Sequence, residues 1–315
     1  MISKFDHQLL WILGALLALL IVASLVGFVL SRTARSKGGK ATVKNLNARI
    51  GAWWKMTGIF GLTLLVGPKG SILLFALISF LALREYVTLI RTSPSDHRTL
   101  FWSFFVFTPL QYWLLYSPWY GLFTLLIPVY AFLFIPTRLV LEGDTTGFLD
   151  RAARIHWGLM ICVYCISYAP ALLILNIPGY HQNAKLLLFL VIVVQLSDVF
   201  QYVWGKMLGR RKIAPLVSPN KTWEGFLGGI FCATAVGTGL WWMTPFKPLQ
   251  AFAMSLLITL LGFAGGLTMS AIKRDRHVKD FGSMIEGHGG ILDRMDSVCF
   301  SAPIFFHLTR YFFSG

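Results

Sequence analysis

One segment near the carboxyl end of the chain carries both signs of charge at high density. Its basic residues include Lys273, Arg274, Lys279 and Arg294, and its acidic residues include Asp280, Asp293 and Asp296. Basic side chains suit a chain of phosphates, and Mg²⁺ favours one or two carboxylates together with substrate phosphates. His288 stands among these charges, followed by two glycines. The segment indicates phosphoryl or nucleotidyl transfer, and the alternative is a loop held together by structural ion pairs.

A second polar segment lies upstream and begins inside a long apolar stretch. Asp198 is an ionisable group at membrane depth, which is costly and usually faces a partner or a wet cavity. The loop after it is basic, and Lys221 and Thr222 stand just before the next apolar stretch. The N-terminus of a helix suits phosphate through its free N–H groups and its dipole. By itself this loop could also be a basic loop that only sets topology. The candidate substrate-binding residues are Asp198, Lys206, Ser218, Asn220, Lys221, Thr222 and Glu224, with Ser270 from the other segment.

The elements that position both segments are predicted to be membrane helices. Of the 315 residues, 56% are hydrophobic and 13% are charged, with a mean hydropathy of +0.67; soluble domains carry about 25% charged residues. A bilayer core requires every backbone polar group to be paired, and the apolar blocks lack the alternation of strands. We therefore expect an all-α polytopic integral membrane protein with ten spanning helices. The alternative is nine spanning helices, with the blocks around 56–66 and 71–90 forming one helix.

The net charge of +15 is concentrated in short loops between the apolar blocks. This distribution argues against nucleic-acid binding and instead sets topology through the positive-inside rule. With Arg32–Lys55 inside, the N-terminus is outside, and the two polar segments share the cytoplasmic side with 91–98 and 138–154. We divide the chain into an anchor with a basic cytoplasmic linker (1–55), N-terminal membrane helices (56–180) and a catalytic membrane domain (181–315).

Small residues recur at four-residue spacing in two of the apolar blocks. One set is Gly225, Gly229, Ala233 and Gly237, and the other is Gly262, Gly266 and Ser270. Such faces let helix backbones approach closely in lipid. We expect them to serve packing.

The acidic and basic segment resembles the signature of the phosphatidate cytidylyltransferases, or CDP-diglyceride synthases. The matching positions are Ser270, Lys273, Arg274, Lys279, Asp280, Gly282, His288, Gly289, Gly290, Asp293, Arg294 and Asp296. The resemblance extends upstream through Asp198, Lys206 and the stretch 218–225. It covers residues 195–297, whereas the N-terminal half agrees only in its hydrophobic pattern.

The resemblance implies an enzyme of the inner (cytoplasmic) membrane that makes CDP-diacylglycerol and pyrophosphate from CTP and phosphatidic acid. Mg²⁺ would be the cofactor, held by Asp280 with help from Asp293 and Asp296, and the enzyme would be a homodimer among membrane lipid. The implied catalytic residues are Lys273, Arg274, Lys279, Asp280, His288, Asp293 and Arg294. His288 has two readings, a group that orients a phosphate or donates a proton, and a structural turn residue.

One position departs from the family pattern. Many bacterial members have Gly-Asp-Leu shortly before the Ser-x-x-Lys-Arg element, and here the sequence is Gly265-Gly266-Leu267. Rival functions are a related cytidylyltransferase or kinase acting on another lipid phosphate, and an inactive or transport paralogue. A transporter would place its charges at mid-membrane between repeats, whereas these lie in loops near one face.

Overall fold

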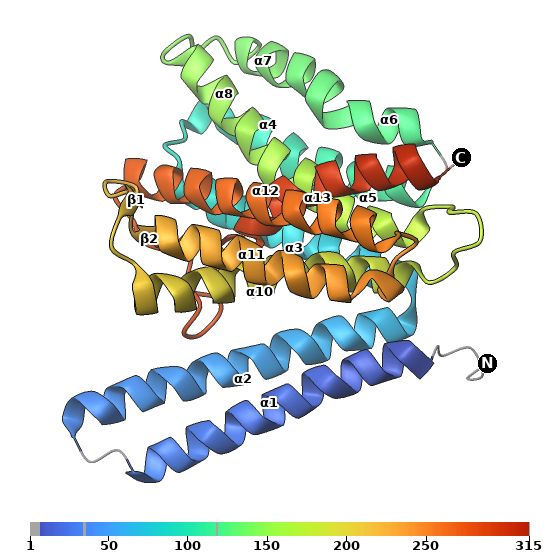
Figure 1. The fold of residues 1–315 in the computed structure, drawn as a ribbon. Helices are drawn as coiled ribbons and strands as arrows, with labels where there is room; N and C mark the ends of the chain where they lie inside the picture. The colour runs from blue at the N-terminus through green and yellow to red at the C-terminus, as the bar shows by residue number, and fades with distance from the viewer. Residues whose placement is uncertain (1–6, 34–35, 118, 315) are drawn as a thin grey trace.

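The structure is a computed structural model that describes residues 7–33, 36–117 and 119–314. It opens with two antiparallel helices, α1 (His7–Thr33) and α2 (Lys37–Val66), which lie beside the main bundle (Figure 1). The Nε1–H of Trp54 donates to the hydroxyl of Ser24 at 3.0 Å and joins them. The stretch predicted as a basic linker is helical from Lys37 onward, and this helix continues past Trp54 to Val66. Apart from Gly38-Gly39 in the first turn, no Gly-Gly or Gly-Pro pair interrupts the sequence before Gly67-Pro68, so one helix runs through the basic residues into the apolar block.

The middle of the chain forms four helical rods. The first is α3 (Pro68–Leu89). A 3₁₀ turn (Pro94–Asp96) then leads into α4 (His97–Trp102), a π-helical turn (Ser103–Phe107) and α5 (Thr108–Tyr116). The third rod is α6 (Tyr120–Leu125), a π turn (Leu126–Ala131) and α7 (Phe132–Val140). The fourth is α8 (Phe148–Leu159), a π turn (Met160–Cys165), α9 (Ile166–Ala171) and a 3₁₀ turn (Leu172–Ile174).

Four further helices complete the bundle: α10 (Asn183–Leu208), α11 (Trp223–Gly239), α12 (Pro248–Asp275) and α13 (Leu292–Phe313). A 3₁₀ turn (Trp241–Met243) follows α11. Between α10 and α11, the strands β1 (Lys212–Ala214) and β2 (Ser218–Thr222) form an antiparallel hairpin. Ser218 and Pro219 begin β2.

The small-residue face of α11 packs against α10, as predicted. A methyl carbon added at Gly225 would stand 2.7 Å from the carbonyl oxygen of Gln201, and one at Gly229 would stand 2.8 Å from the backbone nitrogen of Gln201. These contacts are closer than side chains allow, so glycine permits the two helices to approach. Aromatic and aliphatic side chains of α3, α5, α9, α10 and α13 fill the buried core.

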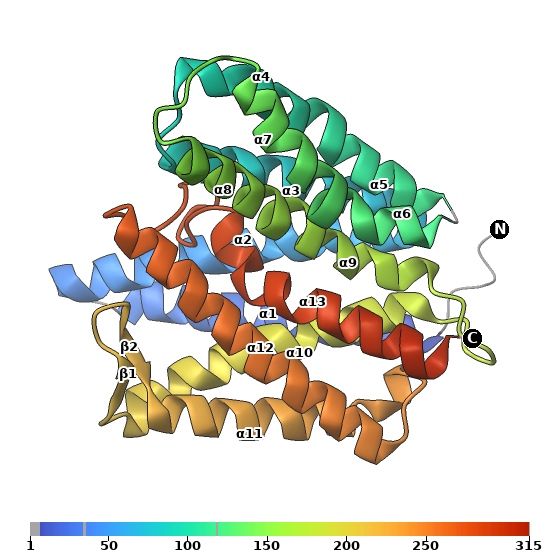
Figure 2. The ribbon, with the colours of Figure 1, turned by 90° about the horizontal axis from the view of Figure 1, so that it is seen from above.

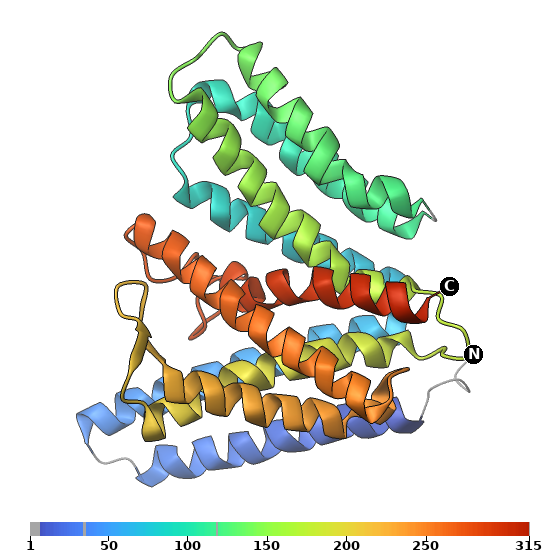
Figure 3. The same ribbon diagram turned by 45° about the horizontal axis from the view of Figure 1, so that its top comes forward.

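The helices run back and forth between two ends of the molecule. The start of α1 and the end of α13 lie at one end, and the hairpin and the loop between α12 and α13 lie at the other (Figures 1 and 2). Figure 3 shows the same division with the polar loops gathered on the left. The two polar segments singled out in the sequence therefore share one end of the bundle.

Six helical rods of the described chain are long and apolar enough to cross a membrane: Trp11–Thr33, Pro68–Leu89, Tyr120–Val140, Phe148–Ile174, Asn183–Leu208 and Pro248–Asp275. The expectation of an all-α polytopic membrane protein is thereby confirmed, with one small β-hairpin added. Four other rods run alongside these six: α2, α4 with α5, α11 and α13. The number of spanning helices, ten or nine, stays a prediction.

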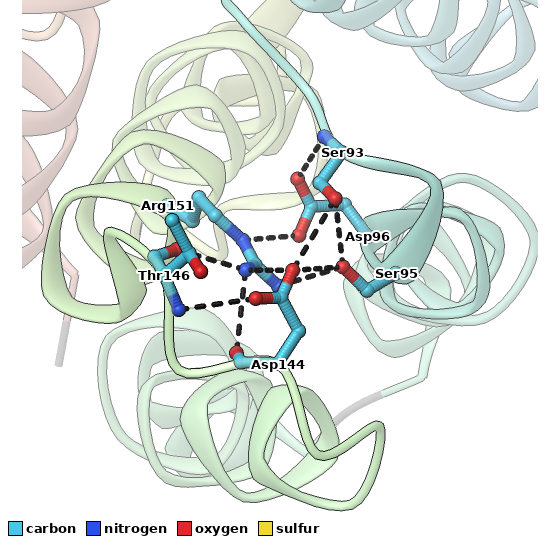
Figure 4. A network of polar contacts seen from close by, with 6 residues as sticks. All are labelled: Ser93, Ser95, Asp96, Asp144, Thr146 and Arg151. Carbon is cyan, nitrogen blue, oxygen red and sulfur yellow. Dashed lines mark hydrogen bonds and ion pairs between the residues drawn. The ribbon is translucent and has the colours of Figure 1, made fainter.

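Two loops at the polar end are tied together by Arg151 of α8 (Figure 4). Its Nε donates to Asp96 at 2.8 Å and its Nη1 donates to Asp144 at 2.6 Å. Asp144 also accepts from the hydroxyl of Ser95 at 2.6 Å and from the backbone N–H of Thr146 at 3.0 Å. These hydrogen bonds hold the pKa of Asp144 well below its ordinary value, and the Arg151 guanidinium adds to the effect. The network fixes the loops 91–96 and 141–147 relative to each other.

Candidate active site

The two polar segments meet directly. The Nε–H of Arg274, at the end of α12, donates to the carbonyl oxygen of Val217 in the hairpin at 3.2 Å. The prediction that the residues around Lys221 and those around Asp280 fold together at one face is confirmed.

A lysine and two carboxylates form the centre of the junction. The hydroxyl of Ser297 donates to both oxygens of Asp198, at 3.1 and 3.3 Å, and so ties α13 to α10. Lys221 enters from β2; burial lowers its pKa, and the charges of Asp198 and Asp296 oppose that shift. Its ammonium also lies 4.6 Å from the ring centroid of Phe263. The sequence predicted Asp198, Lys221 and Asp296 as site residues, and the structure brings them together.

The space for the Lys221 ammonium exists because residue 266 has no side chain. A methyl carbon built on Gly266 would stand 2.8 Å from Nζ of Lys221 and 3.9 Å from Oδ2 of Asp296. We had assigned Gly266 to helix packing, but its open face points into the polar cluster. The departure from the family pattern at this position is thus matched by a lysine that occupies the space.

Asp293 organises the loop that precedes it. Its Oδ1 accepts from Nζ of Lys273 at 2.8 Å, and its Oδ2 accepts from the backbone N–H groups of Phe281 (2.7 Å) and Gly290 (2.9 Å). The side chain is buried. Both carboxylate oxygens are therefore engaged inside the protein, and the metal role that we expected for Asp293 stays a prediction without support from this arrangement.

Glu85 of α3 is a site residue that sequence reasoning missed. Its carboxylate accepts from the backbone N–H groups of Ile291 (3.0 Å) and Leu292 (2.9 Å), where α13 begins. It also lies against the glycines of the loop, 2.3 Å from where a methyl carbon on Gly290 would stand. A buried charge near the end of an apolar helix was the available signal, of the same kind that identified Asp198.

His288 lies in a tight turn and is buried. Its backbone N–H donates to the carbonyl of Ile285 at 2.9 Å. Burial, chiefly, and the neighbouring Arg294 guanidinium hold the pKa of the His288 ring below its ordinary value. Neither Nδ1 of His288 nor Nε of Arg294 has a hydrogen-bond partner among the described residues. Unpartnered buried polar atoms are rare and ask for an explanation, such as an absent ligand.

The remaining predicted residues lie around this centre. Thr222 caps α11 by accepting from the N–H of Gly225 at 3.2 Å, and Glu224 accepts from the N–H of Arg210 at 3.0 Å. Ser270 bonds back to the carbonyl of Gly266 at 2.7 Å. Lys206 is exposed and lies 5.8 Å from the ring centroid of Tyr202. Asn220, Lys279 and Asp280 are exposed, and Ser218 is half-buried. Their predicted roles toward substrate stay predictions.

The acidic side chains at the junction could bind Mg²⁺ only together with other ligands. No group of three or more His, Cys, Asp or Glu side chains converges on one point in the described part of the chain. Asp198 and Asp296 nevertheless act on the same lysine, and neither makes an ion pair within 4.0 Å among the described residues. Mg²⁺ is commonly held by one or two carboxylates plus substrate phosphates. The site fits a cation of that kind only when a substrate supplies the other ligands.

Comparison with known proteins decides the family to which this site belongs. The model of the cytidylyltransferase family matches residues 47–312, from within α2 to the end of α13. The chain belongs to the cytidylyltransferase family. The match spans every site residue described above.

Individual relatives agree with this cytidylyltransferase assignment. The phosphatidate cytidylyltransferase of Bacillus subtilis (strain 168) is 32% identical over 259 residues, which cover 82% of this chain and 91% of that protein. The phosphatidate cytidylyltransferase of Staphylococcus aureus (strain COL) is 31% identical over 190 residues, 60% of this chain and 70% of that protein. The uncharacterized protein YnbB of Escherichia coli (strain K12) is 44% identical over 305 residues, 95% of this chain and 97% of that protein.

Proposed function

We propose that this protein is a phosphatidate cytidylyltransferase, which makes CDP-diacylglycerol and pyrophosphate from CTP and phosphatidic acid. The observation that carries the proposal is the junction of the two polar segments, where the carboxylates of Asp198 in α10 and Asp296 in α13 are close enough to Lys221 to act on its charge. Membership of the cytidylyltransferase family and the two phosphatidate cytidylyltransferases among its relatives support it.

In the proposed reaction a phosphate oxygen of phosphatidic acid attacks the α-phosphorus of CTP. The bond from that phosphorus to the bridging oxygen of the β-phosphate breaks, and pyrophosphate leaves with the electron pair. The nucleophile is already an anion, so no covalent intermediate with the protein is needed. Catalysis then consists mainly of positioning and charge neutralisation.

Different side chains of the site would bind the phosphates of the substrates and the metal ion. The ammonium groups of Lys221 and Lys273 both act electrostatically on the Asp296 carboxylate. They are also close enough to each other that the charge of Lys273 adds to the lowering of the Lys221 pKa. They would bind phosphate oxygens of the nucleotide. His288 and Arg294 offer buried nitrogen atoms without protein partners for a further phosphate. Mg²⁺, held by Asp198 and Asp296 with substrate phosphates, would neutralise the leaving pyrophosphate; Asp280 remains a further candidate.

The orientation that we propose puts the polar end in the cytoplasm of a cell whose inner membrane holds the protein. CTP is a cytoplasmic nucleotide, and the basic loops at this end follow the positive-inside rule. The start of α1 would then face outward. A homodimer is expected from the resemblance and would be tested by the mass of the detergent-solubilised protein.

The test is transfer of label by purified protein in detergent with phosphatidic acid and Mg²⁺. CTP labelled at the α-phosphate should yield an organic-soluble product, and CTP labelled at the γ-phosphate should not. Asp296→Asn should lower the rate at least a hundredfold while the protein still purifies as a folded species. Transfer of only the γ-label would indicate a lipid kinase, and absence of transfer by the wild type would refute the enzyme assignment.

A further inference from the structure

The turn that carries His288 is held from outside by α2, an element that the signature does not include. The Nε–H of Arg49 donates to the carbonyl oxygen of Gly287 at 3.1 Å, across 238 positions of sequence. Trp53 meets the ring of His288 edge to face, with centroids 6.2 Å apart and planes at 87°. Arg49 and Trp53 are four residues apart, so they project from the same face of α2.

The Arg49 contact fixes one particular peptide unit. The carbonyl of Gly287 and the N–H of His288 belong to the same planar peptide group. The carbonyl accepts from Arg49, and the N–H donates to the carbonyl of Ile285 at 2.9 Å. With both polar groups of this plane bonded, its rotation is blocked and the Cα of His288 is held in place.

The turn itself needs such support because of its backbone. Gly287 has φ +72° and Gly289 has φ +83°, conformations that glycine adopts at little cost. The N–H of Ile285 donates to the carbonyl of Gly289 at 2.8 Å and closes the turn. Glycines on both sides of His288 leave the chain free to take other conformations. The contacts of Arg49 and Trp53 from α2 therefore stabilise the one observed.

We propose that Arg49 and Trp53 are positioning residues of the active site, which act on the reaction by holding the His288 turn. The proposal rests on the proposed function and adds α2 to the elements that build the site. The perpendicular contact with Trp53 sets the plane of the imidazole, because aromatic pairs favour edge-to-face geometry. The unpartnered Nδ1 of His288 is then presented to the substrate from a fixed ring.

A double-mutant cycle of Arg49 and His288 tests the coupling. Arg49→Met keeps the length of the side chain and removes the donor, and it should lower kcat about tenfold or more, since small misplacements are costly in catalysis. In the His288→Ala background the same change should have no further effect. Arg49→Lys should recover part of the activity, and Trp53→Phe should lose less than Trp53→Ala. Independent, multiplicative effects of Arg49→Met and His288→Ala would overturn the proposal.

A measurement without turnover separates failure of this proposal from failure of the proposed function. Trypsin should cleave after Arg276, in the loop before the turn, several-fold faster in Arg49→Met than in the wild type. Lys44→Gln removes a positive charge from an exposed position on the same helix and is the matched control. Unchanged cleavage in Arg49→Met would overturn the positioning role even if the wild type is active.

Discussion

Glu85 of α3 caps α13: its carboxylate oxygen Oε2 accepts a hydrogen bond from the backbone N–H of Leu292 at 2.9 Å. The first N–H groups of a helix have no partner within the helix, and a carboxylate there also interacts favourably with the helix dipole. Because Leu292 directly follows the glycine-rich loop, this one contact anchors both the loop and the helix that carries Asp293 and Asp296.

Replacing Glu85 should therefore destabilise the fold. Glu85→Ala leaves the N–H groups of Ile291 and Leu292 without an acceptor, and we expect a loss of roughly 2–4 kcal/mol in the free energy of unfolding. Glu85→Gln keeps one acceptor oxygen and should lose less. Thermal unfolding in detergent measures both. Glu286→Gln, an exposed position in the same loop, is the control and should unfold like the wild type.

Gly266 should be intolerant of even a methyl group in activity, with little effect on stability. In Gly266→Ala the new carbon would stand 2.8 Å from Nζ of Lys221, and the flexible lysine end would move away. We expect kcat/KM for CTP to fall at least about tenfold, or ~1.4 kcal/mol of transition-state stabilisation. Gly262→Ala is the matched control one turn earlier, where the nearest atom would be 3.4 Å away. Equal activities of the two variants would contradict the placement of Lys221.

Arg151 should contribute more to stability than a surface arginine. Asp96 is only 1% exposed, so Arg151→Met would leave a buried carboxylate without its partner. Breaking a buried pair in this way costs about 3–5 kcal/mol. Arg154→Met removes a partly exposed pair, in which the Asp150 side chain is 57% exposed, and should cost at most about 1 kcal/mol. Similar unfolding temperatures for the two variants would show that the loop network does not support the fold.

Asp144 gives the loop network a defined dependence on pH. Its pKa in the fold is below its ordinary value, first because the Ser95 hydroxyl donates to the ionised carboxylate. The ionised form is therefore favoured by folding. Its stabilisation is complete above the unfolded pKa of about 3.9 and is lost as the pH falls through the lower folded value. The difference in stability between the wild type and Asp144→Asn should be constant from pH 5 to 7 and shrink below about pH 4. A difference that grew on acidification would reverse this sign.

The membrane architecture and the site junction could be predicted because both depend on signals that are local in sequence. Long apolar blocks predict helices, and charge in alternate loops predicts which loops share an end. That the regions of Lys221 and Asp280 share one face followed from counting helices. The small-residue spacing at Gly225 and Gly229 predicted a packing face, and the structure confirmed it.

What sequence reasoning missed depends on contacts between distant parts of the chain. Glu85, Arg49 and Trp53 reach the site from α2 and α3, more than 190 positions before the loop that they hold. Nothing adjacent to them in sequence marks a partner. The basic stretch before Trp53 predicts a linker, with or without a helix, because charge alone does not distinguish an exposed helix from a loop.

Gly67 joins α2 to α3 with φ +100° and ψ −170°, a backbone conformation open essentially to glycine alone. A rotation of the backbone at this residue would change the angle between α2 and α3. Arg49 lies eighteen residues along α2 from Gly67, or about 27 Å at the rise of an α-helix. A swing of about ten degrees at Gly67 would carry Arg49 through about 5 Å, enough to break its contact with Gly287. A change in the angle of α2 would therefore also remove the hydrogen bond that Arg49 donates to the turn carrying His288.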